Sequence, residues 1–130
     1  MGYGKIRTAE MASCKVYNDL ADFVGHVEQE GGYYNLYRGW TDFIGRIEQE
    51  GGYYTVYQTG VQFVGRIEPE GETYKVYRRW TYFVGHLRRE GGQYNVYQGW
   101  TGLIGSVELE DTVQASPLLL SGGAALLLLL

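Results

Sequence analysis

The feature that most constrains this chain is a repeat of twenty residues that runs from residue 15 to residue 114. Five units follow one another without gaps, from KVYNDLADFVGHVEQEGGYY to NVYQGWTGLIGSVELEDTVQ, and a Tyr, a Gly and a Glu recur at fixed positions in each. Repeated units of this size bury a core only by stacking on their neighbours. At 130 residues the chain is long enough for one domain and too short for two. The repeat therefore indicates a single folding unit.

Each unit contains two short runs that are typical of β-strands. The second unit has DFIGRIE at residues 42–48, and YYTVY follows at residues 53–57. Both runs are rich in β-branched and aromatic residues, and polar segments with Gly, QEGG and RGWT, separate the runs. We expect these segments to be four-residue hairpin turns. The 13 Tyr and 20 Gly residues of the chain agree with strands and tight turns.

These turns predict a register and, from it, a barrel. Pairing Glu48 with Tyr53, and Tyr37 with Asp42, staggers successive units by two residues, or about ten over five units. A sheet whose shear matches its strand number can close. We therefore predict an all-β fold. It is an antiparallel up-and-down meander of five hairpin repeats with about ten to eleven short strands, and a closed or nearly closed barrel is favoured over an open twisted sheet.

The same register predicts which side chains share a face, because they alternate along a strand. The expected inward set is Phe43, Gly45, Ile47, Tyr34, Leu36, Tyr54 and Val56. We expect the recurring glycine to lie beneath an aromatic ring of the neighbouring strand.

The opposite face is predicted to be half apolar, whereas a solvated sheet face is normally polar. Extended apolar patches mark interfaces, so we predict an interaction face made of Tyr37, Tyr57, Tyr77, Tyr97, Ile44, Val64 and Val84. The alternative is that these cross-strand pairs only stabilise the sheet.

The chain divides at Pro117. We assign residues 1–116 to the β-hairpin repeat domain, with residues 1–14 as an N-terminal cap, and residues 117–130 to an apolar Leu-rich tail. From residue 118 the tail has 13 residues without a charge, short of the ~20 that span a membrane. The favoured interpretation is a plug packed on the sheet or in the barrel mouth. The alternatives are a shallow membrane or partner contact by residues 118–130 and a disordered end. Gly122 and Gly123 are expected to interrupt any helix.

Three tryptophans suggest a second kind of site. Trp40, Trp80 and Trp100 lie in the predicted turns of the RGWT type, where an exposed indole can stack on a sugar or a quaternary ammonium group. This favours, as an alternative function, a carbohydrate- or small-cation-binding module.

No pattern for catalysis is found. His26 and His86 share a repeat position with Arg46, Arg66 and Ser106, which predicts a solvated position at the rim rather than a ligand. Cys14 falls at the position of the inward tyrosines. There is no nucleophile elbow, phosphate loop or dinucleotide fingerprint. We predict no enzyme activity, no catalytic residue, no metal and no cofactor.

The net charge and the single cysteine limit the classes of partner and the cellular compartments that we expect. A net charge of −4 and a pI near 5.1 argue against nucleic acid. One cysteine excludes an intrachain disulfide framework, and the N-terminus lacks the apolar stretch of a signal peptide, which slightly favours the cytoplasm. The sequence thus predicts a non-enzymatic scaffold or interaction module. It would associate with a protein partner or with itself through sheet edges or the Tyr/Ile/Val face.

Overall fold

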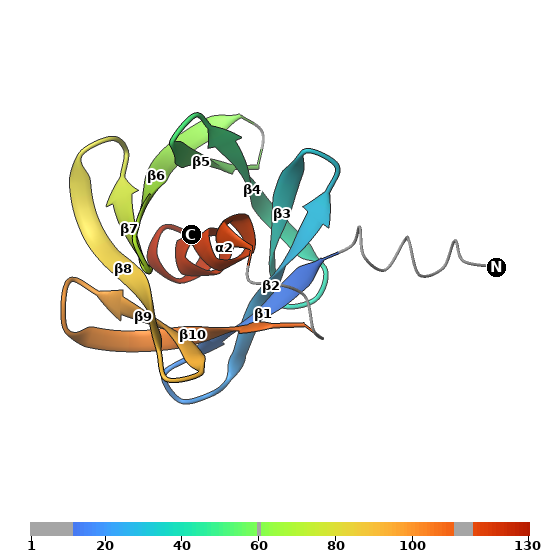
Figure 1. Cartoon of the computed structure of the whole chain (residues 1–130). Coiled ribbons are helices and arrows are strands. Elements are labelled where there is room, and N and C mark those ends of the chain that lie inside the picture. The colour runs from blue at the N-terminus through green and yellow to red at the C-terminus, as the bar shows by residue number, and fades with distance from the viewer. Residues whose placement is uncertain (1–11, 60, 111–115) are drawn as a thin grey trace.

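The protein is a closed antiparallel barrel with a helix in its centre (Figure 1). The computed structural model describes residues 12–59, 61–110 and 116–130. In this part of the chain the strands are β1 (Ser13–Asn18), β2 (Phe23–Glu30), β3 (Tyr33–Arg38), β4 (Asp42–Glu50), β5 (Tyr53–Gln58), β6 (Gln62–Glu70), β7 (Thr73–Arg78), β8 (Tyr82–Glu90), β9 (Gln93–Gln98) and β10 (Gly102–Leu109). Each pairs with the next, and β1 pairs with β10. The predicted meander barrel is confirmed. Most of the expected N-terminal cap lies outside the described residues.

The stagger of the strands explains why the sheet closes. Ile47 of β4 pairs with Val56 of β5, and Val56 pairs with Gly65 of β6. The two pairings lead from Ile47 to Gly65, which is 18 residues along the chain, whereas the repeat is 20 residues long. The register therefore slips by two residues per unit. Five units accumulate a shear of about ten, which equals the number of strands.

The turns are tighter than predicted. Glu50 pairs with Tyr53, so β4 and β5 are joined by the two residues Gly51 and Gly52 rather than by four. Gly51 has a φ of +64°, a conformation that glycine adopts without steric cost. The predicted pairing of Glu48 with Tyr53 was wrong by two residues. Because side chains alternate with a period of two, this error did not change the face of any residue.

A bulge in every second hairpin does change the faces. In the β3–β4 pair, Leu36 is opposite Gly45 but Tyr37 is opposite Phe43, which leaves Ile44 as an extra residue. A bulge of this kind breaks the alternation of side chains. Ile44 therefore packs against the core, whereas Phe43 is 42% exposed. Phe43 and Tyr54, expected on the same face, lie on opposite faces, and the placement predicted for Phe43 was wrong.

The recurring glycine is required by the backbone of the neighbouring strand. A Cβ atom on Gly45 would overlap the carbonyl oxygen of Tyr57, and the other four glycines of this position meet the equivalent Tyr carbonyl. Gly45 also lies close to Leu130, and Gly85 close to Leu128. The nearest atoms at this position belong to the backbone of the neighbouring strand and to leucines at the end of the chain, and not to the aromatic ring that was expected.

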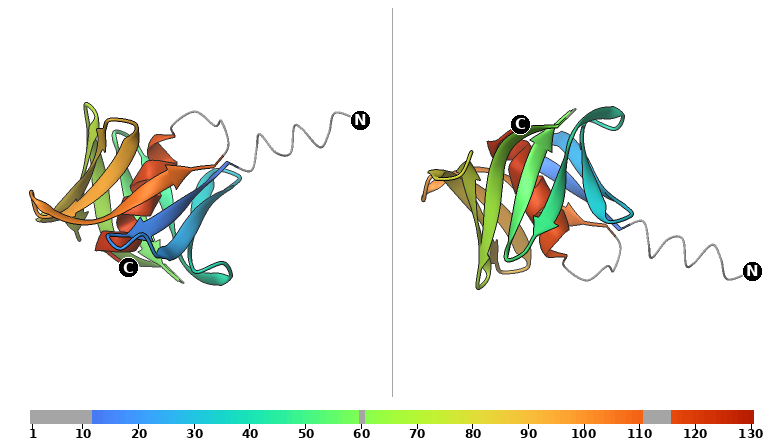
Figure 2. Two further views of the ribbon diagram at one scale, coloured as in Figure 1. Left: turned by 90° about the horizontal axis from the view of Figure 1, so that it is seen from below. Right: turned by 90° about the horizontal axis from the view of Figure 1, so that it is seen from above.

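The tail forms helix α2 (Pro117–Leu128), which runs through the barrel and lies against all ten strands (Figure 2). It packs on a layer of fully buried strand residues, among them Val27, Leu36, Ile47, Val56 and Leu87. The favoured interpretation of the tail as a plug is confirmed. No helix of the described residues has the length and apolar character that crossing a membrane would need.

The two glycines expected to break α2 instead allow it to fit. Gly122 lies against Val27 and Leu36, and Gly123 against Val107, and a Cβ atom on either glycine would press on these valine side chains. The helix begins with Ser116 as its N-cap and Pro117 in its first turn, as is common at helix starts. Burial on all sides, rather than intrinsic propensity, therefore maintains the helix.

Two arginines donate hydrogen bonds at the C-terminal end of α2. Arg38 donates a hydrogen bond to the carbonyl oxygen of Leu130 at 2.8 Å, and Arg78 donates one to that of Leu128 at 3.1 Å. Cations at a helix C-terminus are favourable because the last carbonyls carry partial negative charge. Both arginines end strands that precede turns of the RGWT type, so the C-terminus of α2 lies at that end of the barrel.

Candidate functional site

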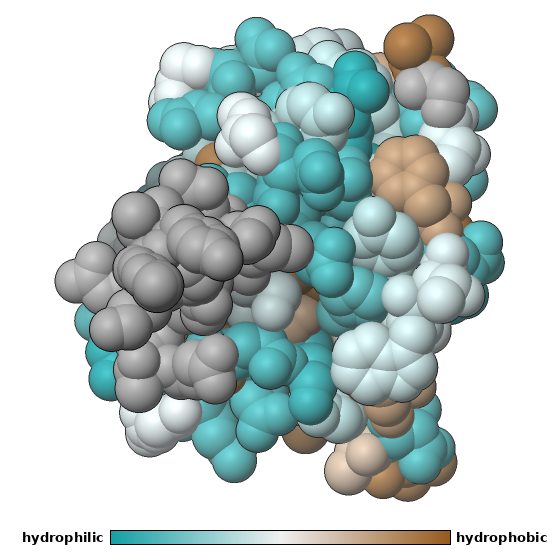
Figure 3. Space-filling view, turned by 90° about the vertical axis from the view of Figure 1, so that its right-hand side faces the viewer, coloured by the Kyte–Doolittle hydropathy of each residue, from teal (hydrophilic) through white to brown (hydrophobic). Residues whose placement is uncertain are grey.

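The two ends of the barrel differ in chemistry. Nearly all exposed large hydrophobic residues lie in or beside the turns of the RGWT type, which form one end, and we call this set the apolar rim. Its members are Leu20, Trp40, Phe43, Val61, Trp80, Tyr82, Trp100 and Leu103. The opposite end carries the paired Gly turns and the Glu-rich strand ends, such as Glu48 and Glu50. In Figure 3, hydrophobic residues gather toward one edge, beside a wall that is mostly hydrophilic.

Each tryptophan of the rim is held by a phenylalanine of the preceding unit. Trp40 stacks on Phe23 with the ring centroids 4.3 Å apart and the planes 22° apart. Trp80 stacks on Phe63 at 4.4 Å, and Trp100 stacks on Phe83 at 4.5 Å. The three tryptophans remain 49–60% exposed. The indoles are thus held by neighbouring side chains yet remain about half exposed, at three separate turns rather than in one cluster.

The Tyr residues of the predicted interaction face are engaged by neighbours on the outer wall. The ring of Tyr37 stacks on that of His26 at 4.7 Å, and the guanidinium of Arg66 lies 4.3 Å from the centroid of Tyr77. Tyr57 and Tyr97 contact Arg46 and Arg88 in the same way, at 5.5 and 4.6 Å. All four tyrosines are half-buried.

The aliphatic members of that predicted face lie elsewhere. Ile44, Val64 and Val84 pack against the core, because each is the extra residue of a bulge. A continuous outer Tyr/Ile/Val stripe is therefore not formed, and this expectation is corrected. Pairing of β1 with β10 also leaves no free sheet edge among the described strands for association.

The two histidines are structural and buried. His26 is 6% exposed and His86 is 1% exposed, so the predicted solvated rim position was wrong. Nδ1 of His26 lies 3.1 Å from the carbonyl oxygen of Gly39, and Nδ1 of His86 lies 3.0 Å from that of Gly99. Each ring thus fixes the Gly-Trp turn that follows it. The signal was present in the sequence, since the two units with histidine are those followed by Gly-Trp.

We expect His86 to make stability depend on pH. Burial lowers the pKa of His86 below its ordinary value of 6.5. The unfolded chain therefore binds a proton more readily than the folded one, so its stability is complete above about pH 6.5 and falls as pH decreases below that value. Thermal unfolding should show a Tm lower by about 2–5 °C at pH 5.5 than at pH 7.5. His86→Arg, with the residue that two other units carry here, should reduce this difference, and an unchanged difference would contradict the assignment.

Ion pairs lie on the outer wall beside the tyrosines. Arg46 lies 2.6 Å from Glu48, and Arg88 lies 2.8 Å from Glu90. Hydrogen bonds from Asn95, Tyr97 and Arg88 lower the pKa of Glu90 to about 2. These arginine and glutamate charges pair with one another on the outer wall.

Cys14 is fully buried, and its Sγ lies 3.4 Å from the carbonyl oxygen of Leu119. Burial raises the pKa of this thiol far above its ordinary value, so the thiolate needed for a nucleophile is disfavoured. Within the described part of the chain, no three His, Cys, Asp or Glu side chains are grouped to hold a metal ion.

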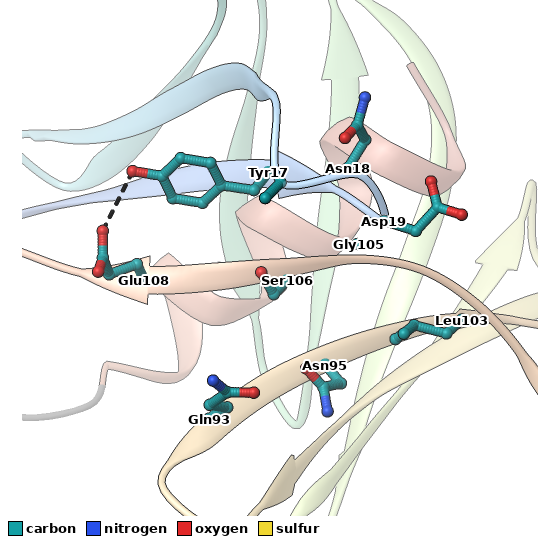
Figure 4. A pocket seen from close by; sticks show the side chains of 10 residues that line it. Tyr17, Asn18, Asp19, Gln93, Asn95, Leu103, Gly105, Ser106 and Glu108 are labelled. Carbon is teal, nitrogen blue, oxygen red and sulfur yellow. Dashed lines mark hydrogen bonds between the residues drawn. The ribbon is translucent and has the colours of Figure 1, made fainter.

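A depression of about 350 Å³ lies on the outer wall where the barrel closes (Figure 4). It is bordered by β1, β10 and β9, and Tyr17, Asn95, Ser106 and Glu108 are among the residues that line it. A second depression, of about 460 Å³, shares Tyr17, Gln93, Ser106 and Glu108 with the first, so we call the two together the closure groove. No pattern in the sequence indicates this groove, because β1 and β10 are distant in the sequence.

Comparisons with family models, with curated proteins and with solved structures find no match for this chain.

Proposed function

We propose that this protein is a non-catalytic interaction module that binds a protein partner through the apolar rim. The observation that carries the proposal is the state of the three tryptophans. Each is stacked on a phenylalanine, yet about half of each side chain is exposed. An aromatic ring that is already fixed loses little conformational freedom when a partner covers it. Exposed apolar residues gathered at one end of a molecule commonly mark a binding surface.

The polar residues of this end support a protein partner. Tyr82 is 68% exposed, Arg79 precedes Trp80 in the same turn, and Arg38 and Arg78 end the strands that lead into these turns. Trp, Tyr and Arg are the residue types that most often dominate the binding energy of protein interfaces. Glutamate is depleted in interfaces, which argues for the rim rather than the Glu-rich end.

The test is site-specific photo-crosslinking in the native cell. A photoreactive amino acid at position 82 probes the apolar rim, and the same amino acid at the exposed Gln49 position probes the opposite end. We expect a discrete protein adduct from position 82 and none from position 49. Trp40→Ala combined with Trp80→Ala should weaken the adduct about tenfold or more, because central aromatic residues carry most of the binding energy. An adduct of twice the chain mass would identify a second copy as the partner.

The matched control is Tyr33→Ala, which removes an exposed aromatic residue from the opposite end and should leave the adduct unchanged. Equal adducts from both positions, or none from position 82, would overturn the proposal. The accessible indole faces also favour the alternative of a carbohydrate or small-cation ligand. In that case Trp fluorescence would shift with a glycan or choline, and position 82 would give no protein adduct.

A further inference from the structure

One position of the repeat carries arginine in two units and histidine in two others, and it carries serine where the barrel closes. His26, Arg46, Arg66 and His86 occupy this position in the first four units, and Ser106 occupies it in the fifth. In every unit the residue lies directly opposite the recurring tyrosine. Arg66 is paired with Tyr77 across β6 and β7, and Ser106 is paired with Tyr17 across β10 and β1.

The third unit shows what a complete set of these residues does. Arg66 Nη1 lies 3.0 Å from the carboxylate of Glu68, and its guanidinium lies 4.3 Å from the ring centroid of Tyr77. In the second unit, Arg46 makes the same two contacts with Glu48 and Tyr57, at 2.6 and 5.5 Å. A guanidinium held between a carboxylate and a tyrosine ring is therefore a recurring structural element of this wall.

Where β1 pairs with β10, the tyrosine and the glutamate of this element are present, but the arginine is replaced by Ser106. Tyr17 donates a hydrogen bond to Glu108 at 3.1 Å, which places the carboxylate at the hydroxyl end of the ring (Figure 4). Lys15 lies 3.5 Å from Glu110, as Lys75 lies 2.7 Å from Glu70 beside Arg66. Lys15 thus has the role of Lys75 and does not replace the arginine. Among the described residues, Glu108 makes no ion pair.

The space left by the missing arginine side chain is open. The closure groove lies over Ser106, and the described residues that line it include Asp19 and Glu108 but no Lys, Arg or His. Amide side chains of Gln93 and Asn95 add hydrogen-bond acceptors on the β9 side. A planar cation with several N–H donors fits this combination of acceptors better than a single-point ammonium.

We propose that the closure groove binds the guanidinium group of a ligand, between the ring of Tyr17 and the carboxylate of Glu108. The ligand supplies there the cation that Arg66 supplies in the third unit. This site lies on the wall at β1, β10 and β9, and its existence does not depend on the proposed role of the tryptophans.

The test is a titration of the full chain with ethylguanidinium chloride, followed by amide chemical shifts in NMR spectra at constant ionic strength. We expect saturable shifts centred on Ser106, Glu108 and Tyr17, with a Kd on the order of millimolar, because the site is open to solvent. Ethylurea, which has the same shape without the charge, should bind at least tenfold more weakly. A capped Gly-Arg-Gly peptide distinguishes the sources. Tighter binding than ethylguanidinium indicates an arginine of a polypeptide, and equal or weaker binding indicates a free guanidino compound.

Variants of two positions separate recognition from folding. Glu108→Gln should weaken ethylguanidinium at least tenfold. Ser106→Arg, which restores the pattern of the second and third units, should keep the fold and abolish binding, because its own guanidinium fills the groove. Ser106→Ala, which leaves the groove open, is the matched control and should bind as the unchanged chain does. Equal affinity for ethylguanidinium and ethylurea, or undiminished binding to Ser106→Arg, would overturn the proposal.

Discussion

A chain shortened to end at Ser116 is expected to lose cooperative unfolding altogether. Helix α2 fills the interior of the barrel, and five of its leucines or of those just after it are less than 10% exposed: Leu119, Leu120, Leu126, Leu128 and Leu129. Burial of a leucine side chain contributes about 1.5–3 kcal/mol, so the five together contribute about 8–15 kcal/mol. This matches the entire stability of a typical domain, which is about 5–15 kcal/mol. Thermal denaturation followed by near-ultraviolet circular dichroism measures the loss.

Single substitutions test the same role of helix α2 without shortening the chain. Leu120→Asp places an unpaired carboxylate in the apolar interior, where Leu120 is 1% exposed, and should unfold the protein near neutral pH. Leu20→Asp, at a residue that is 77% exposed, is the matched control and should leave the Tm nearly unchanged. If the shortened chain melted cooperatively at the original temperature, the helix would not be the core of the barrel.

The second large effect is expected at the recurring glycine. In Gly85→Ala the new methyl group would overlap the carbonyl oxygen of Tyr97 and press on Leu128, and backbone atoms cannot move aside as a flexible side chain can. We expect the free energy of unfolding to fall by about 1–3 kcal/mol or more, as for other overpacked cores. Urea denaturation of the two proteins measures the difference.

Gly92→Ala provides the matched control for that substitution. No atom lies within 4 Å of the place where its Cβ would be, and its φ is not in the left-handed region. Its stability should stay within about 1 kcal/mol of the original, because only the entropy of the unfolded chain changes. Similar losses in both variants would mean that general glycine flexibility, and not the close approach of β9 to β8, explains the recurrence.

The twenty-residue period was sufficient to predict the barrel, because closure depends on the stagger per unit. The predicted turns were wrong by up to two residues, but the errors on the two sides of each strand cancelled in the slip of two. The prediction of which face each side chain occupies was more sensitive to such errors. A single extra residue at Ile44 exchanged the roles of Phe43 and Ile44, and no property of these apolar residues in the sequence reveals a bulge.

Prediction was weakest where residues distant in the sequence meet. The tryptophans were correctly predicted to lie in the turns of the RGWT type, yet their phenylalanine partners come from the preceding unit, 17 residues earlier for Trp40 and Phe23. The closure groove depends on β1 lying beside β10, so Tyr17 and Glu108 become neighbours only after the ring is complete. Helix propensity predicted that Gly122 and Gly123 would break α2, whereas packing against Val27 and Val107 determined the outcome.

The position of α2 has a consequence for how the protein is made. Every strand precedes the helix in the chain, and the first strand must pair with the last. A ribosome that has released nine strands has therefore produced a curved sheet whose apolar concave surface has neither its final neighbour nor its filling. Long-range pairing of this kind slows folding and prolongs the exposure of apolar surface that is prone to aggregation. We infer that the nascent chain reaches its native state only after its last turn of helix has emerged, in a single late step rather than hairpin by hairpin.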